Sequence, residues 1–154
     1  MSFNHYSFKP NFVIQNSLAQ TVFGSCFLGD TVLPNRKIHK VTVDEYSKLV
    51  LFELLSGNPD ASIVLLAHGM GGSSESAYIK RIALKLWARG LSVFMMNHRG
   101  SGLGMGLSKY LWNGGVSDDL EKIIDYILGL YPEKFIDVVG FSLSGNILLK
   151  YLNG

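Results

Sequence analysis

The stretch VVGFSLSGNILLKY, residues 138–151, joins an apolar run that ends in Gly140 to a serine two positions later. Residues that favour helices follow this serine, so the order predicts a strand, a sharp turn and a helix, with Ser142 at the turn. Such a turn pushes a serine hydroxyl outward, and the next backbone N–H, that of Leu143, can help to stabilise an oxyanion. Ser142 is therefore a candidate nucleophile.

The turn needs small residues two positions before and two positions after the serine. Gly140 and Ser144 occupy these positions, which gives the pattern G-F-S-L-S. Because Ser144 is small but is not glycine, crowding or a hydrogen bond from its side chain would alter the turn. Centring the pattern on Ser144 instead puts Asn146 at a small-residue position, which fits worse. A chance G-x-S at the end of a strand is the alternative.

Composition limits the kind of protein. The chain has 154 residues, of which 47% are hydrophobic and 17% charged, so one globular domain is expected. A net charge of +2, with basic and acidic residues interspersed, gives no sign of a nucleic-acid surface. Cys26 is the only cysteine and fits a reducing compartment. The first ten residues do not form a signal peptide and the apolar runs are too short to cross a bilayer, so a soluble, cytoplasmic protein is expected.

Hydrophobic patterning divides the chain in two. Residues 1–36 have weak periodicity and predict an irregular N-terminal arm, whereas residues 37–154 predict an α/β domain with a mostly parallel sheet. In this domain we expect a hairpin over 38–54, buried strands over 62–67, 91–96 and 135–140, and helices over 75–88, from Asp118, and after Ser142. Glu121 stands at capping-box spacing from Asp118.

Three loops follow the three buried strands, and the carboxyl ends of parallel strands meet at one edge of a sheet. The first loop is HGMGG, residues 68–72, whose glycines allow a sharp turn that presents N–H groups. The Met70 N–H is the candidate second oxyanion donor, although an ordinary turn is the alternative. We expect His68 to bond to loop backbone rather than to act as a catalytic base.

Two other kinds of site are not predicted. A dinucleotide-type G-x-G-x-x-G starting at Gly100 fails because residue 105 is methionine, and no phosphate-binding G-x-x-x-x-G-K-[ST] occurs. The four histidines are spread along the chain with one cysteine, so metal-ligand spacing is absent from the sequence. No cofactor and no metal are expected.

Three motifs, HGMGG, NHRGSG and GFSLSG, follow one another in an order that resembles the α/β-hydrolase superfamily. The longer phrases HGMGGSSESAY, MMNHRGSG and VGFSLSGNILLKYL are similar to its YheT-like branch. The segment NSLAQT, residues 16–21, resembles the N-P-H-x-Q-T segment of that branch, with Ser17 and Leu18 in place of proline and histidine. The resemblance runs from about Phe8 to the end of the chain.

The resemblance implies roles for individual residues. Ser142 matches the nucleophile, the N–H groups of Met70 and Leu143 match the oxyanion hole, and Asp118 matches the start of the preceding helix. Ser144 replaces the second glycine of G-x-S-x-G. The family's activity implies acyl transfer on a small-molecule carboxylic ester.

The acid and histidine of this superfamily follow the serine in chain order. After Ser142 the sequence contains LSGNILLKYLNG, with neither Asp, Glu nor His. The resemblance therefore covers the N-terminal half of the fold, truncated after the nucleophile helix, and another polypeptide would have to complement the triad. We expect an open hydrophobic edge on the strand over 135–140. The alternative is a non-catalytic remnant or an interaction subunit.

Overall fold

The computed structural model describes residues 15–20 and 31–153, and the chain forms two compact units, residues 1–30 and 31–154. In the first unit, residues 17–20 are helical, and the Asn16 side chain accepts a hydrogen bond from the Ala19 N–H at 3.1 Å. Cys26, and Thr21 of the NSLAQT segment, lie outside the described residues. The second unit carries the sheet and the helices discussed below.

The second unit is built on a five-stranded mixed sheet of order β1-β2-β4-β3-β5. Strand β3 pairs in parallel with β4 and with β5, whereas β2 is antiparallel to both β1 and β4. The predicted hairpin and three strands are present, and β3 and β4 are buried as predicted, but β5 is not, since none of its residues is buried. The parallel pairing is confined to β4, β3 and β5. The strands are β1 (Lys37–Asp44), β2 (Ser47–Leu54), β3 (Ile63–Ala67), β4 (Ser92–Asn97) and β5 (Ile136–Gly140).

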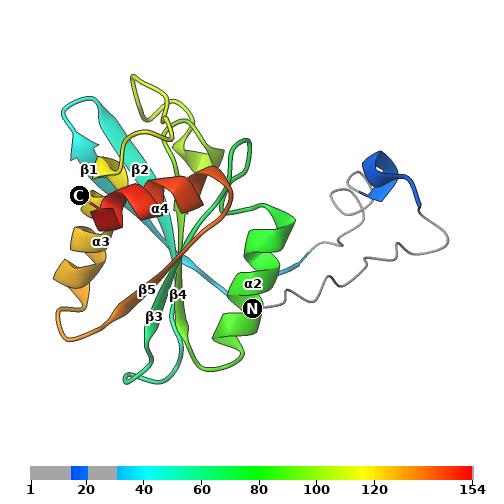
Figure 1. Ribbon diagram of the computed structural model, residues 1–154. Helices are drawn as coiled ribbons and strands as arrows, with labels where there is room; N and C mark the ends of the chain where they lie inside the picture. The colour runs from blue at the N-terminus through cyan, green and yellow to red at the C-terminus, as the bar shows by residue number, and fades with distance from the viewer. Residues whose placement is uncertain (1–14, 21–30, 154) are drawn as a thin grey trace, which may run out of the picture. The chain divides into compact units, whose positions relative to one another are not determined.

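Helices cover both faces of this sheet: α3 (Asp118–Leu130) and α4 (Leu143–Asn153) lie on one face and α2 (Ala77–Trp87) on the other (Figure 1). A short 3₁₀ helix, η1 (Gly102–Gly104), lies in the loop after β4. Among the described residues, none of the helices has the length and hydrophobicity needed to cross a membrane.

Helix α3 begins at Asp118 as predicted, but the predicted capping box is wrong. Ser117 is the N-cap, and its side chain makes no capping hydrogen bond. The N-cap therefore lies one residue earlier than the box requires, which moves Glu121 one position too far into the helix. The three acidic residues of the first turn, Asp118, Asp119 and Glu121, still favour this end of the helix through the helix dipole.

The central strand β3 explains why the apolar run over 63–67 has no polar alternation: its side chains are buried on both faces. Ile63, Leu65 and Ala67 belong to the core beneath α3 and α4, and Val64 and Leu66 to the core beneath α2. Side chains from β2 and β4 extend both cores. The sheet is therefore a rigid support for the loops at its edge.

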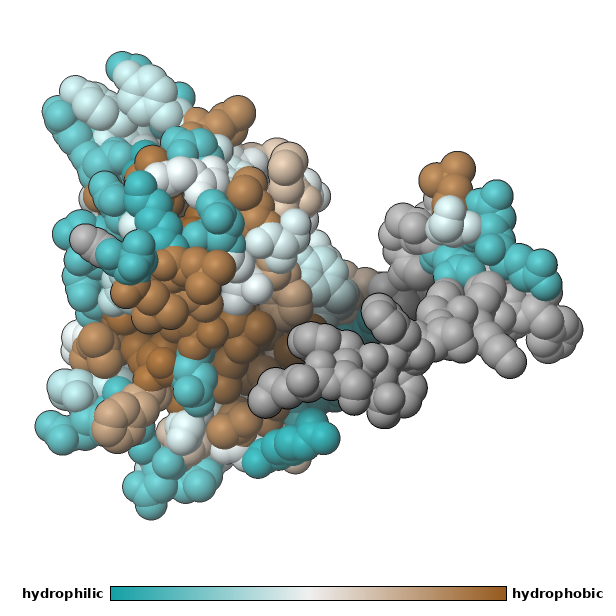
Figure 2. Space-filling model, in the orientation of Figure 1, coloured by the Kyte–Doolittle hydropathy of each residue, from teal (hydrophilic) through white to brown (hydrophobic). Residues whose placement is uncertain are grey.

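The last strand in the sheet order, β5, has an open outer edge, as predicted. Within the described residues it pairs with β3 alone. Apolar side chains near it are exposed: Phe135 to 90%, Val139 to 38%, and Leu149 and Leu152 of α4 to 68% and 72%. In the space-filling view, a hydrophobic surface extends over the region where Figure 1 shows β5 and α4 (Figure 2).

Candidate active site

The three candidate loops leave the sheet at the same edge. In the parallel register, Ala67 at the end of β3 pairs with Met96 of β4 on one side and with Gly140 of β5 on the other. The HGMGG loop, the NHRG loop and the Ser142 turn therefore begin beside one another. The convergence predicted from the sequence is confirmed.

Ser142 lies at the sharp turn between β5 and α4. Its φ is +53°, and it is the one residue other than glycine with a positive φ among residues 15–20 and 31–153. The Phe141 N–H bonds to the Ala67 carbonyl at 3.0 Å, and the Gly145 N–H bonds to the Ser142 carbonyl at 2.9 Å. These bonds hold a strained backbone that presents an exposed serine side chain, which is the geometry of a nucleophile elbow.

Two glycines make this geometry possible. A Cβ atom on Gly140 would lie 2.5 Å from the Ser144 carbonyl oxygen, so α4 can start directly above β5 only because that position has no side chain. A Cβ atom on Gly69 would lie 3.0 Å from the Ser142 Cβ. The HGMGG loop is therefore in close contact with the candidate nucleophile.

Two backbone N–H groups are expected in an oxyanion hole, those of Met70 and Leu143. Within the described residues, neither the Met70 N–H nor the Leu143 N–H has a hydrogen-bond acceptor. Met70 follows Gly69 in the loop against Ser142, and Leu143 is the first residue of α4, where the helix dipole favours negative charge. The arrangement can stabilise an anion beside Ser142.

The Ser142 hydroxyl has no hydrogen-bonded partner in the described part of the chain, neither a histidine nor a carboxylate. A free serine hydroxyl is a weak nucleophile at neutral pH. Across the same residues, no group of three or more His, Cys, Asp or Glu side chains is arranged to hold a metal ion. The chemistry available at this edge is thus a serine next to the first N–H of α4 and in contact with the loop that carries the Met70 N–H.

Ser144, which replaces the second glycine of the motif, is buried and hydrogen-bonded. Its side-chain oxygen lies 2.7 Å from the His98 Nε2 and donates its own hydrogen to the carbonyl of His68. Because that hydroxyl hydrogen is already used, His98 Nε2–H must be the donor to Ser144. The sequence suggested that a serine at this position would form a side-chain hydrogen bond. Ser144 forms two, and they connect the turn to the loops that carry His68 and His98.

His68 bonds to backbone groups on both sides of its ring, as predicted. Its Nε2 accepts from the His98 N–H at 3.3 Å, so Nδ1 carries the hydrogen and donates to the Gly69 carbonyl at 2.7 Å. Burial lowers the pKa of His68. His68 therefore stays neutral and fixes the loop that carries the Met70 N–H.

Sequence reasoning did not identify His98 or Trp112. The two rings stack with their centroids 4.0 Å apart and their planes 5° from parallel, and His98 is almost completely buried. Burial, with a further contribution from nearby His68, lowers the pKa of His98 to about 3, so the ring is neutral at neutral pH. The position of His98 immediately after a buried strand was the one signal in the sequence that pointed to it.

The Ser144–His98 pair has the distance of a nucleophile and its base, but its surroundings differ from those of a catalytic pair. Ser144 is 1% exposed, and its hydroxyl hydrogen is bonded to a carbonyl. A substrate carbonyl cannot reach it. A cavity of about 160 Å³ is lined by His98 together with Trp112, Arg99 and Ile147, and neither Ser142 nor Ser144 is in its lining. We therefore retain Ser142 as the candidate nucleophile.

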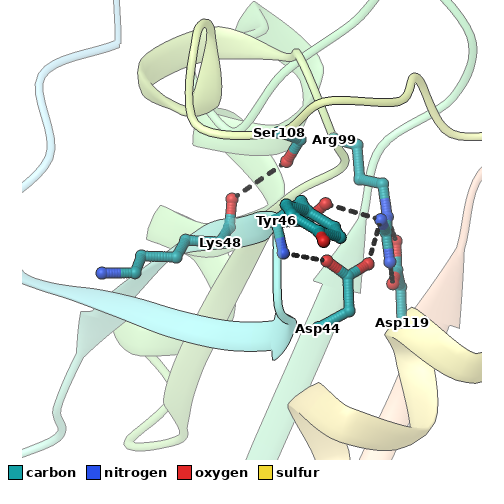
Figure 3. Close-up of polar contacts among 7 residues, drawn as sticks. Asp44, Tyr46, Lys48, Arg99, Ser108 and Asp119 are labelled. Carbon is teal, nitrogen blue, oxygen red and sulfur yellow. Dashed lines mark hydrogen bonds and ion pairs between the residues drawn. The ribbon is translucent and has the colours of Figure 1, made fainter.

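Arg99, the next residue of the NHRG loop, joins this edge to the hairpin and to α3 (Figure 3). Its guanidinium bonds to both carboxylate oxygens of Asp119 at 2.6 and 2.5 Å, to Asp44 at 2.5 Å and to Ser47 at 2.8 Å. The bond to Arg99 lowers the pKa of the Asp44 carboxyl. Arg99 therefore supports the loop that holds His98 rather than presenting a free cation to a ligand.

Comparison with known proteins identifies the family of this fold. Residues 62–153 match the family model for the α/β-hydrolase fold. The chain belongs to the α/β-hydrolase family. Monoacylglycerol lipase ABHD2 of Mus musculus is 30% identical to it over 121 residues, which cover 77% of this chain and 28% of the mouse protein. Abhydrolase domain-containing protein 2 of Drosophila melanogaster is 28% identical over 103 residues, 66% of this chain and 26% of the fly protein.

Solved structures show the same fold. The Pyrococcus furiosus esterase Pf2001 superposes with a TM-score of 0.66 at 23% identity, over 77% of this chain and 46% of the esterase. XC6422 from Xanthomonas campestris, described as an α/β serine hydrolase without a lid, superposes with a TM-score of 0.60 at 18% identity. The chain thus spans about a quarter of these curated relatives and about half of the esterase.

Proposed function

We propose that this chain provides the nucleophile and oxyanion-hole part of a serine hydrolase that acts on carboxylic esters. Ser142 is the nucleophile, and the N–H groups of Met70 and Leu143 are the oxyanion donors. The observation that carries the proposal is the positive φ of Ser142 at a turn that leads into the first N–H of α4 and contacts the loop carrying the Met70 N–H. Family membership and relatives described as lipases and esterases support the reaction class.

In the proposed reaction the Ser142 oxygen attacks the ester carbonyl carbon, and the carbonyl oxygen becomes an oxyanion held by the two N–H groups. A histidine oriented by an acid takes the serine proton and passes it to the leaving alcohol. Water then hydrolyses the acyl-serine and restores the hydroxyl. The histidine and the acid come from polypeptide outside the 154 residues in this proposal, because both follow the serine in the family's chain order and residues 143–154 contain neither.

We place the chain in the YheT-like branch of the family and in the cytoplasm. The branch rests on the wording of the three motifs and on the NSLAQT segment, and the compartment rests on the single cysteine. The substrate is a small-molecule ester in this proposal. No cofactor takes part in it.

The test uses a fluorophosphonate probe and a chromogenic short-chain ester. The purified 154-residue chain is assayed alone and after mixing with the product of the reading frame that follows the Gly154 codon. We expect little or no turnover by the chain alone, and labelling and turnover in the mixture that Ser142→Ala abolishes. Ser62→Ala, at the opposite end of β3, is the matched control and should retain both activities.

Robust Ser142-dependent turnover by the chain alone would overturn the need for a complementing polypeptide. An absence of labelling in both samples would favour the alternative, a non-catalytic remnant or interaction subunit. The open edge of β5 and the exposed Phe135 favour that alternative, because an unpaired apolar edge suits strand addition from a partner. Ser142-dependent labelling in the mixture therefore distinguishes the serine hydrolase from the non-catalytic alternative.

A further inference from the structure

We propose that Ser144 and His98 are positioning residues that hold the nucleophile turn against both neighbouring loops. His98 Nε2–H donates a hydrogen bond to the Ser144 hydroxyl, and that hydroxyl donates to the His68 carbonyl. This inference rests on the proposed function for its meaning, because the turn it positions is that of Ser142. It goes beyond that function by giving a role to the residue that departs from the G-x-S-x-G motif.

The first step of the argument is the place of Ser144 in the turn. Ser144 lies one residue inside α4, and its N–H bonds to the Phe141 carbonyl at 3.0 Å across the strained Ser142. Whatever fixes the Ser144 side chain therefore fixes the backbone on the helix side of Ser142. A glycine at this position has no side chain with which to make such a bond.

The second step is that the bonds reach both other loops. His98 follows β4 and His68 follows β3, and the Ser144 hydroxyl joins the ring of one to the carbonyl of the other. The His98 N–H to His68 Nε2 bond closes this connection into a ring of bonds. His68 also holds the Gly69 carbonyl at 2.7 Å, next to the proposed Met70 donor.

The third step is that the ring cannot be replaced by water. Ser144, His98 and His68 are all buried, at 1%, 3% and 0% exposure, and Trp112 covers His98 by stacking. A buried polar group that loses its partner keeps the cost of its removal from water. The bonded arrangement is therefore strongly preferred over alternatives in which one of the three side chains turns away.

Native-state hydrogen exchange of the 154-residue chain tests this without catalysis. In Ser144→Ala and Ser144→Gly we expect the amides of Phe141, Gly145 and His98 to exchange about tenfold faster, the factor that matches loss of one buried hydrogen bond. Amides of the β1–β2 hairpin should be unchanged. Ser142→Ala, which removes a hydroxyl two residues away that has no bonded partner, is the matched control and should leave all these rates unchanged.

Variants of His98 provide the second arm. His98→Leu fills the site with an apolar side chain that has no donor, so it should accelerate exchange of the same amides. His98→Gln places an amide N–H near the Nε2 position and should restore most of the protection. ¹⁵N NMR of the wild-type ring should show a neutral imidazole with its hydrogen on Nε2, hydrogen-bonded in wild type and not in Ser144→Ala.

Unchanged exchange in Ser144→Ala, acceleration spread evenly over the hairpin, or failure of His98→Gln to restore protection would each overturn the proposal. Amide exchange and ring NMR do not depend on a catalytic triad, so they can support the positioning role even where fluorophosphonate labelling is absent. A failure of the positioning proposal is therefore distinguishable from a failure of the proposed function.

Discussion

At the scale of single residues, the Ser142 turn shows what a motif can and cannot predict. The turn and its small neighbours follow from local sterics, because Gly140 faces the backbone of Ser144 and no side chain fits there. The hydrogen-bond partners of Ser144 could not be predicted from the motif, since His68 and His98 are 76 and 46 residues earlier in the chain. A local motif indicates which side-chain sizes the turn can accept, whereas the hydrogen-bond partners of those side chains depend on the tertiary fold.

Replacing Gly140 by alanine should destabilise the protein by about 1–3 kcal/mol, because the new Cβ would press on backbone atoms that cannot move aside cheaply. Gly57→Ala is the control, since nothing lies within 4 Å of a Cβ at that position. Urea unfolding of the two variants measures the difference. Equal midpoints for both variants would show that α4 adjusts to the added methyl.

The buried His98 should make the protein less stable in mild acid. Its pKa is about 3 in the folded state and near 6.5 when unfolded, so between these values the unfolded chain binds the extra proton. Stability contributed by the neutral ring is therefore complete above about pH 6.5 and falls with decreasing pH, by at most about 1.4 kcal/mol per pH unit.

This dependence is checked by urea unfolding of wild type and His98→Gln at pH 7 and pH 5. The loss of stability between the two pH values should be smaller in His98→Gln, which has no ring to protonate. His68, whose pKa is also lowered, contributes in the same direction in both proteins and does not affect the comparison. An equal loss in the two proteins would contradict the prediction.

At the scale of elements, the strands and helices were predictable because each has a clear hydrophobic period. The hairpin and the strands β3, β4 and β5 are apolar or alternating, and the loops between them carry glycine. The ion pairs between elements were harder to predict from the sequence. Arg99 pairs with Asp119 and Asp44, which are 20 and 55 residues away, and the sequence contains many other acidic residues that could have been its partners. The start of α3 was predicted, but its cap was displaced by one residue.

The partly buried ion pair between Arg99 and Asp119 should matter more than an exposed one. Asp119→Asn removes the charge from two guanidinium bonds and should cost about 1–2 kcal/mol. Glu75→Gln makes the same chemical change at an exposed single bond to Arg36 and should cost less than about 0.5 kcal/mol. Thermal or urea unfolding compares the two, and a larger loss in Glu75→Gln would contradict this ranking.

At the scale of the whole molecule, the sheet formed by residues 31–153 ends in a strand, β5, whose outer edge is open within that range. Its neighbours on the surface are apolar, with Phe135 the most exposed of them. Soluble proteins normally protect such edges with charge, proline or a covering element, because an unpaired edge recruits strands from other molecules. The family resemblance predicted this open edge, because the strand over 135–140 is central in the complete family fold.

The wild-type chain should therefore self-associate as its concentration rises, and a lysine on β5 should reduce the association. Val139→Lys places a charge on β5, and Val32→Lys makes the same change at a side chain that is 83% exposed and outside the sheet. Light scattering after size-exclusion chromatography should show less association in Val139→Lys alone. A monomeric wild type, or equal association in both variants, would contradict the prediction.

The pairing of β5 with β3 also bears on the order of events during synthesis. The bonds that hold the Ser142 turn reach to Ala67, His68 and His98, all of which are translated before β5. The turn can therefore close as soon as α4 has left the ribosome, since domains fold while synthesis continues. Ser142 would then adopt its strained conformation while the outer edge of β5 is still unpaired and able to accept another strand.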